Sequence, residues 1–395
     1  MTDQNFLEIL ILHQIQLLEG VEYWHLIILT ARVNFFFVFY IISLMSKITK
    51  EGFAELLPRV KQNEWKFMKA ATKAWSLREA ARISGLSIST LHRMLYNFRR
   101  KGQFKFLIDL KKTNLLMLAA IFPKLNIRRA PPFTTTVRDV YNVGSYTLIV
   151  ALVPPPLVRK YIDYFESEPL IVVEGYEYLR WSPLSPLSKY DPQTGAILPE
   201  FDFERVRRLY EYPVEKWDNG LKAPDVYDLV LLQGRMRNPF ARPLTIYKEA
   251  RKKDPSLPEV SEQVLSYHFT RHVKAIWRGN TALVFANMKI IPVRLLYFEG
   301  KDAPVFARIL CQLPGAFSAI IDVDKALVVG QFPCNYDEYI MREAEGFDVE
   351  MPYGCFIQSS TDMRKVAPWF WKYVEGKKWV FKEELCIPVI ASRAL

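Results

Sequence analysis

The segment that most constrains the fold runs from Ser76 to Gly102, with the sequence SLREAARISGLSISTLHRMLYNFRRKG. Ser76 and Glu79 form an S-x-x-E capping box, in which each side chain satisfies an unpaired amide at a helix start. Gly85 suits a left-handed turn, where a Cβ atom would be costly. Ser87 is a good N-cap for the helix that follows. The pattern therefore predicts two short helices joined by a sharp turn, a helix-turn-helix.

The second predicted helix has an apolar face and a polar face. Leu91, Leu95 and Phe98 recur at three- and four-residue steps and form its buried stripe, and Ala81 is expected where the first helix crosses it. The polar face carries hydrogen-bond donors and cations suited to base edges and phosphates in a DNA major groove. An ordinary helical hairpin with a solvated basic face is the alternative. The predicted DNA-binding residues are Ser87, Ser89, Thr90, His92, Arg93, Tyr96, Asn97, Arg99 and Arg100.

Positive charge is concentrated in residues 51–130. The whole chain of 395 residues has a net charge of +11, whereas this segment alone, with 9 Lys and 8 Arg against 4 Glu and 1 Asp, carries +12. One basic module on a near-neutral body is the electrostatic footprint of a protein that binds a polyanion. A high isoelectric point alone would not indicate this, since many stable thermophile proteins are rich in Lys and Arg.

Residues 1–44 form an apolar N-terminal extension unlike the rest of the chain. Trp24 to Met45 has the composition of a membrane span, but Arg32 and Asn34 lie near its middle, where a charge is expensive. Three interpretations stay open: a translated leader before a true start at Met45, a membrane anchor, or a buried N-terminal helix. We expect the first, so we expect a cytoplasmic protein with no membrane partner unless residues 1–44 belong to the mature chain.

The segment after the first head predicts an α+β body. A helix is expected to run from Lys61 to Ala74, and Phe104 to Leu110 reads as a wing or hinge strand. Four more strands and a helix are expected after it. Two of these strands are the halves of Val137–Val153, which Gly144 separates. With a further helix between Phe122 and Ala130, the order is β-α-β-β-α-β, that of a ferredoxin-like sandwich. The expected elements are strands at Leu115–Phe122, at both halves of Val137–Val153 and at Ile171–Trp181, and a helix at Leu157–Phe165.

The chain then repeats this plan. Residues 221–280 carry 5 Lys and 6 Arg against 3 Asp and 3 Glu, a net charge of +5, and contain helical patterns at 223–237, 244–253 and 261–277. Val264, Leu265, Phe269 and Val273 are expected to face inward. The second set of predicted DNA-binding residues is Gln263, Ser266, Tyr267, Thr270, Arg271 and Lys274. The following elements again read β-α-β-β-α-β: strands at 289–299, 316–323, 325–332 and 353–359, and helices at 303–313 and 336–345.

These patterns together resemble the Lrp/AsnC (feast/famine) regulators, and most closely the archaeal proteins with two such units in one chain. The resemblance rests on Ser76 to Gly102, Val137 to Trp181 and SYHFTRHV from Ser266 to Val273, and the modules cover about three quarters of the chain. The expected fold is α+β, with tandem winged helix-turn-helix heads each followed by a ferredoxin-like domain. The expected domains are the extension 1–44, a first head 45–112, a first body 113–182, a linker 183–220, a second head 221–284, and a second body with a tail 285–395.

The resemblance implies a sequence-specific DNA-binding transcription regulator. We also expect no enzymatic activity and no cofactor, because the sequence contains no P-loop and no glycine-rich dinucleotide fingerprint. The implied partners are double-stranded DNA, further copies of the chain joined through the ferredoxin-like domains, and an amino-acid effector. No residue set identifies an effector site, and the long turn before Ser261 leaves DNA binding by the second head open. An architectural or protein-interaction protein without sequence specificity is the alternative function, with an aromatic cluster at Trp369, Phe370, Trp371 and Tyr373 as its strongest feature.

Metal and catalytic signals are weak in the sequence. The four cysteines, Cys311, Cys334, Cys355 and Cys386, form no C-x-x-C pair, and only five histidines exist, so neither a zinc site nor a disulfide framework is expected. A nucleic-acid enzyme would need clustered carboxylates for metal ions. The nearest candidates are Asp322, Asp324, Asp337 and Glu338, which read as ordinary strand-end and helix-start acids.

Overall fold

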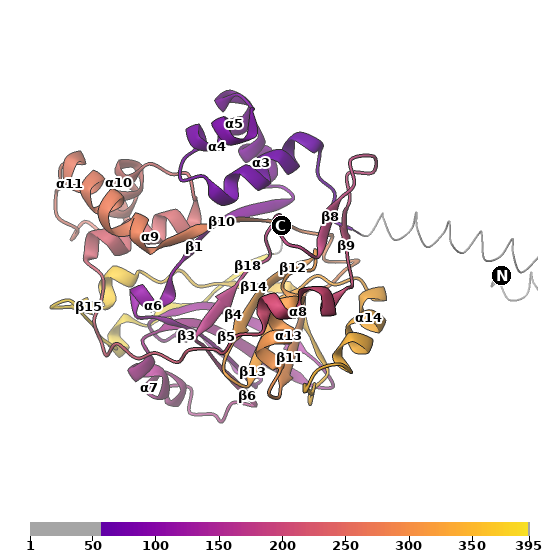
Figure 1. Ribbon diagram of the computed structural model, residues 1–395. Helices are drawn as coiled ribbons and strands as arrows, with labels where there is room; N and C mark the ends of the chain where they lie inside the picture. The colour runs from indigo at the N-terminus through magenta and orange to yellow at the C-terminus, as the bar shows by residue number, and fades with distance from the viewer. Residues whose placement is uncertain (1–56, 394–395) are drawn as a thin grey trace, which may run out of the picture. The chain divides into compact units, whose positions relative to one another are not determined.

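The computed structural model describes residues 57–393, so the expectations for residues 1–44 lie outside the described residues. Within the described part, no helix combines the length and apolar character needed to cross a bilayer. The first three helices pack together on one side of the fold (Figure 1). They are α3 (Gln62–Lys73), α4 (Leu77–Ser84) and α5 (Ile88–Phe98).

The caps of α4 and α5 lie where the sequence predicted them. The Ser76 hydroxyl accepts a hydrogen bond from the Glu79 amide at 3.2 Å, and the Glu79 carboxylate accepts one from the Trp75 amide at 2.7 Å. Gly85 ends α4 with a φ of 71°. Ser87 accepts a hydrogen bond from the Thr90 amide at 3.2 Å. Local hydrogen bonds therefore set both helix starts.

The predicted buried face of these helices is partly wrong. Leu91 and Phe98 are buried, but Leu95 is only half-buried. Ala80 is fully buried, whereas Ala81, expected at the helix crossing, is half-buried. The reason is that α4 packs against α3 as well as α5, which turns the face bearing Ala80 inward.

A second group of helices packs on the same two-stranded ribbon as the first group. The strand β1 (Gly102–Ile108) pairs antiparallel with β10 (Trp277–Val284), a pairing between the two halves that the sequence did not indicate. The Trp75 ring contacts those of Phe269 at 4.7 Å and Trp277 at 5.0 Å, and so joins the two groups. The second group comprises α9 (Val226–Arg237), α10 (Pro243–Lys253), α11 (Glu262–His268), the π-helical turn η2 (Phe269–Val273) and α12 (Lys274–Ile276).

The helices of the second group match the predicted ranges, except for the π-helical turn. Leu265, Phe269 and Val273 are buried as expected. Val264 is 39% exposed, so the prediction that it faces inward is wrong. Its position directly before Leu265 on α11 turns it about 100° away from the buried face.

The body is one large antiparallel sheet, so the α+β class is confirmed. Its first four strands lie in the order β6-β2-β5-β4. No helix forms between Phe122 and Ala130, contrary to expectation, because β2 continues to Pro123 and β3 pairs with the distant β17. The elements of this part are α6 (Leu110–Thr113), β2 (Leu116–Pro123), β3 (Arg129–Ala130), β4 (Thr134–Tyr141), β5 (Ser145–Val153), η1 (Pro155–Leu157), α7 (Val158–Asp163) and β6 (Ile171–Gly175).

The second four strands lie in the order β14-β11-β13-β12 and join the first set through β4 and β14. All six predicted elements of this half are present. They are β11 (Arg294–Glu299), α13 (Ala303–Leu310), β12 (Ala316–Ile321), β13 (Lys325–Gly330), α14 (Asn335–Ala344) and β14 (Cys355–Lys365). Of these, β11, α13, β12 and β13 are shorter than predicted, α14 is shifted by one residue, and β14 extends beyond its predicted end.

Two consecutive strands, β6 and β7 (Glu177–Leu179), pair with opposite edges of the sheet. The strand β6 pairs with β2 at one edge, and β7, which follows directly, pairs with β12 at the other. A Cβ atom at Gly175 would lie 2.5 Å from the Ile320 Cγ2 atom and 2.6 Å from the Met117 carbonyl oxygen. A side chain is therefore excluded where the chain passes from one edge to the other.

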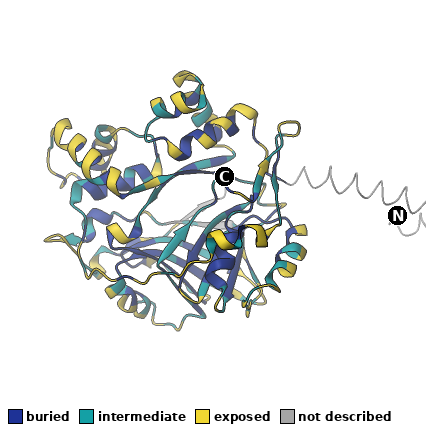
Figure 2. Ribbon diagram, in the orientation of Figure 1, coloured by how far each residue is buried: buried dark blue, intermediate teal, exposed yellow. Residues whose placement is uncertain are grey.

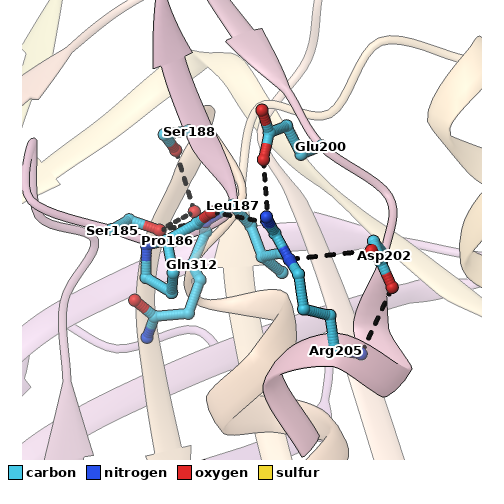
Figure 3. A network of polar contacts seen from close by, with 8 residues as sticks. All are labelled: Ser185, Pro186, Leu187, Ser188, Glu200, Asp202, Arg205 and Gln312. Atoms are coloured by element: carbon cyan, nitrogen blue, oxygen red, sulfur yellow. Dashed lines mark hydrogen bonds and ion pairs between the residues drawn. The ribbon is translucent and has the colours of Figure 1, made fainter.

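Residues 183–220, expected as an extended linker, pack on the body. They form β8 (Ser188–Tyr190), β9 (Ile197–Pro199) and α8 (Phe203–Tyr210). In Figure 3, Ser185 and Ser188 both donate hydrogen bonds to the Gln312 carbonyl oxygen after α13, and Arg205 pairs with Glu200 at 2.8 Å.

The C-terminal segment completes the core. Phe370, Trp371 and Tyr373 are buried, and the Phe133 ring contacts that of Tyr373 at 4.9 Å, so core packing accounts for this aromatic cluster. Figure 2 shows the buried strands beneath helices whose outer faces are exposed. The remaining elements are η3 (Phe370–Tyr373), β15 (Val374–Glu375), β16 (Lys378–Trp379), η4 (Glu383–Leu385), β17 (Ile387–Pro388) and β18 (Ile390–Arg393).

Candidate functional site

The predicted DNA-binding side chains lie on two separate helical surfaces. Those of the first set lie on α5 and at its two ends, and they are exposed except Thr90, which is half-buried. Thr90, Arg93 and Asn97 border a hollow beside the start of α3. Those of the second set are all exposed on α11, η2 and α12. The structure does not bring the two sets together into one site.

A cleft between the β1–β10 ribbon and the sheet is the strongest candidate site. It encloses about 370 Å³ and brings together residues from β1, β2, β4, β5, β7, α9 and β10. Its apolar walls include Phe106, Met117 and Leu152, and the hydroxyl-bearing Thr135 and Thr136 lie among them. Side chains of β1 alternate between the two faces of the strand. Phe104 and Phe106 are therefore buried, whereas Lys105 between them is half-buried and lines the cleft.

Three cations line this cleft: Lys105 of β1, Arg180 just after β7, and Arg278 of β10. Among the side chains that the structure describes, no carboxylate forms an ion pair or hydrogen bond with any of the three. The Arg180 guanidinium instead lies over the Tyr178 ring, 5.2 Å from its centroid. Three positive groups facing one cavity without counter-charges leave that cavity strongly electropositive.

The environment of Lys105 perturbs its ionisation. Burial, and secondarily the positive charge of Arg180, lowers the pKa of the Lys105 ammonium from 10.5 to about 8. The charged form is disfavoured because the ammonium loses hydration and meets a second cation. Ionisable side chains in clefts whose pKa values are shifted by burial and a nearby charge are candidates for functional residues. The only sequence signal was Lys105 between two phenylalanines in a strand, and it was counted solely toward the basic charge.

A buried arginine packs behind the cleft. Arg235 of α9 is 3% exposed, and its guanidinium carbon lies 4.4 Å from the Phe269 ring and 4.7 Å from the Trp75 ring. One terminal nitrogen donates a hydrogen bond to the Trp75 carbonyl oxygen at 3.2 Å. Burial lowers the pKa of Arg235 to about 9. Its neighbour Met236 lines the cleft, so Arg235 helps to hold α9 against the ribbon.

One group of side chains within residues 57–393 has the composition of a metal site. Asp228 of α9, His268 of α11 and His272 of η2 each place a ligand atom within 4.8 Å of the other two. This group was not predicted, because the expectation of no zinc site rested on the absence of cysteine pairs and on the small number of histidines, although His268 and His272 are only four residues apart. The four acids considered there instead do not form such a group, and Asp337 is paired with Arg294 at 2.6 Å.

The comparisons with known proteins give two similar solved structures. The first is siroheme decarboxylase NirDL, with 11% sequence identity and a TM-score of 0.38. The second is the same enzyme in co-complex with an iron-uroporphyrin III analogue, with 12% identity and a TM-score of 0.36. Each match covers 75% of this chain and 91% of the NirDL chain. No protein-family model and no curated protein matches.

These findings contradict the interpretation of the chain as an Lrp/AsnC-like transcription regulator. Both similar structures are of an enzyme, one of them with a tetrapyrrole analogue, whereas that interpretation named double-stranded DNA as the partner and excluded enzymatic activity. The regulator and architectural functions, the DNA and oligomer partners, the amino-acid effector and the non-enzyme assignment are therefore withdrawn. At this degree of likeness, the activity of NirDL does not transfer to this chain.

The structure also gives a physical reason why the net charge of residues 51–130 was a poor guide to a DNA-binding surface. Several cations counted in the basic module of residues 51–130 are paired with acids. Lys101 meets Glu64 at 2.6 Å, and Lys124 meets Asp139 at 2.5 Å. Lys105 lines the cleft instead of the outer surface. The net charge of a segment therefore overstated the positive surface that its helices present.

Proposed function

We propose that this chain binds a small molecule that carries several carboxylates on an apolar framework, in the cleft lined by Lys105, Arg180 and Arg278. The observation that carries the proposal is the set of three cations without counter-charges above apolar walls. Guanidinium groups bind carboxylates through short, charge-assisted hydrogen bonds, and the apolar walls favour a hydrophobic body. The volume of about 370 Å³ lies within the range of small-molecule sites.

The ionisation of Lys105 supports an anionic ligand rather than a neutral one. A ligand carboxylate beside the ammonium would restore the charge compensation that burial removes, and would raise the pKa of Lys105 from about 8. Binding should therefore take up protons near pH 8. It should also weaken as the pH rises through this value, because the unliganded lysine is then neutral.

Porphyrins that share one ring but differ in carboxylate number test this proposal. Uroporphyrin, coproporphyrin and protoporphyrin carry eight, four and two carboxylates, respectively, and their binding to the full chain can be followed by absorbance and tryptophan quenching. We expect affinity to fall in that order, because charge-assisted hydrogen bonds are each worth roughly 1.5–3 kcal/mol. Equal affinity for all three would indicate that only the apolar walls bind the ring.

Variants assign the binding to the cleft. Arg180→Met and Arg278→Met should each weaken uroporphyrin binding by roughly tenfold or more, since 1.4 kcal/mol corresponds to tenfold. Arg208 of α8 is exposed and lies outside the cleft, so Arg208→Met is the matched control. Unchanged affinity in both cleft variants, or equal losses in the control, would refute the proposal.

We also propose that the body consists of two ferredoxin-like units, at 113–182 and 285–395, each preceded by a helical head, at 45–112 and 221–284. The two strand orders, β6-β2-β5-β4 and β14-β11-β13-β12, support this, since each is fourth-first-third-second within its own set. The pairing of β1 with β10, each following a helical group, supports the same relation. The first unit differs in having no helix between β2 and β4.

A further inference from the structure

Asp228 is a buried carboxylate whose partners are two histidines. It lies in the first turn of α9 and is 4% exposed. One carboxylate oxygen lies 2.8 Å from the His268 Nδ1 atom, and the other lies 3.0 Å from the His272 Nδ1 atom. Within the described residues, no lysine or arginine forms an ion pair with Asp228. A buried carboxylate is costly unless positive charge or hydrogen bonds compensate it.

The backbone holds the two histidines on the same side of one helical segment. His268 ends α11, and His272 follows four residues later in the π-helical turn η2. Their rings are 5.0 Å apart and nearly perpendicular. Single π-helical turns within α-helices occur frequently at functional sites, because they change the direction of side chains without ending the helix.

Aromatic rings restrict the positions of both imidazoles. The Tyr267 ring meets the His268 ring edge-on at 5.8 Å and the His272 ring at 5.5 Å. The Tyr227 ring lies 5.1 Å from that of His268. The His272 side chain is 40% exposed, whereas that of His268 is 13% exposed. The group is therefore held in place and open to solvent on the His272 side.

We infer that Asp228, His268 and His272 form a binding site for a divalent transition-metal cation such as Zn²⁺ or Co²⁺. Bonds of about 2.0–2.2 Å to nitrogen and carboxylate oxygen place neighbouring ligand atoms roughly 2.8–3.6 Å apart in octahedral or tetrahedral geometry. The observed oxygen–nitrogen separations of 2.8, 3.0 and 3.2 Å fall in this range. The cation also supplies the positive charge that the buried carboxylate needs.

Three protein ligands leave at least one coordination position for water or another ligand. Two imidazoles with one carboxylate suit a first-row metal ion better than Mg²⁺ or Ca²⁺, which prefer oxygen ligands alone. A bound cation would also tie α9 to η2. Phe269 in that turn packs on the Arg235 guanidinium behind the cleft, so the site would stabilise this part of the cleft wall.

Cobalt uptake by the full chain tests the inference directly. The protein is treated with a chelator, desalted and titrated with Co²⁺ while the visible absorption of the bound ion is recorded, and Zn²⁺ uptake is measured by equilibrium dialysis with elemental analysis. The His272→Ala variant should take up one equivalent fewer than the wild type, or bind that equivalent more than tenfold more weakly. Zn²⁺ should raise the melting temperature of the wild type more than that of the variant.

Two further variants separate metal binding from a purely structural role. Asp228→Asn keeps the shape of the side chain but removes its charge, and it should lose the same equivalent. His92 is exposed on α5, away from the group, so His92→Ala is the matched control and should bind as the wild type does. Because His272 is well exposed, its removal keeps the test valid even where Asp228→Asn does not fold.

Two results would overturn the inference. One is the absence of saturable Co²⁺ or Zn²⁺ binding to the wild type at micromolar concentrations. The other is the same uptake and affinity in His272→Ala as in the wild type, which would place any bound metal elsewhere in the chain. Either result would leave Asp228 as a carboxylate that only accepts hydrogen bonds from two histidines. Neither result measures ligand binding by the three cations of the cleft, so the two proposals can be refuted separately.

Discussion

Replacing Lys105 with Met tests the electrostatics of the cleft without any ligand. Burial lowers the pKa of Lys105 from 10.5 to about 8 in the folded chain, while the unfolded chain keeps the ordinary value. Between these two values the unfolded state holds a proton that the folded state has lost. Stability therefore rises with pH across this window, and below about pH 8 the folded protein bears the full penalty of a desolvated ammonium.

The size of the penalty follows from the two pKa values. One pKa unit corresponds to 1.36 kcal/mol, so the difference between 10.5 and about 8 corresponds to about 3 kcal/mol. Lys105 is only half-buried, and solvent screening reduces this figure. We expect Lys105→Met to be more stable than the wild type by roughly 1–3 kcal/mol near pH 7, and this charge-dependent difference to decrease as the pH rises from about 8 toward 10.5.

Urea denaturation followed by circular dichroism, at several pH values between about 7 and 10, measures this difference. Lys189 is an exposed lysine outside the cleft, so Lys189→Met is the matched control and should show no such pH dependence. A Lys105→Met variant that is less stable than the wild type near pH 7, or a difference independent of pH, would refute the reasoning. The lysine would then be compensated in the folded chain rather than left unpaired.

Three further predictions concern contacts that stabilise the fold. Arg308 is fully buried and donates hydrogen bonds to Glu177 at 2.7 and 2.9 Å, so Arg308→Met should cost about 3–5 kcal/mol in urea denaturation, and adding Glu177→Gln should recover part of it. A Cβ atom at Gly175 would lie 2.5 Å from the Ile320 side chain, so Gly175→Ala should lower the melting temperature through a loss of about 1–3 kcal/mol. Ser76→Ala should cost about 1 kcal/mol, because the cap of α4 is lost, and an unchanged urea midpoint would contradict that role.

Local signals in the sequence were sufficient for most of the helices and strands. Ser76, Gly85 and Ser87 act through hydrogen bonds and backbone angles within a few residues, so their effect can be read without the rest of the fold. The alternating strands and the helices predicted in residues 289–359 are likewise present, with bounds that differ by a few residues. The helix expected between Phe122 and Ala130 failed because β3 pairs with β17, more than 250 residues away.

The candidate sites were not predictable in the same way. Lys105, Arg180 and Arg278 come from three strands or strand ends, and they meet only because β1 pairs with β10 above the sheet. Asp228 lies 40 residues before His268, on another helix, and a π-helical turn places His272 beside both. The three cations have no spacing that a sequence pattern could detect. His268 and His272 are four residues apart, but nothing in the sequence places Asp228 beside them.

The sequence by itself determined where α4 and α5 begin, which segments alternate as strands, and that one part of the chain is rich in cations. Those properties depend on neighbours within a few residues. Only the tertiary structure decided which of the cations are neutralised, as Lys101 is by Glu64, and which face a cavity without a partner, as Lys105 does. Charge compensation depends on distance and burial in three dimensions, and neither is a property of sequence order.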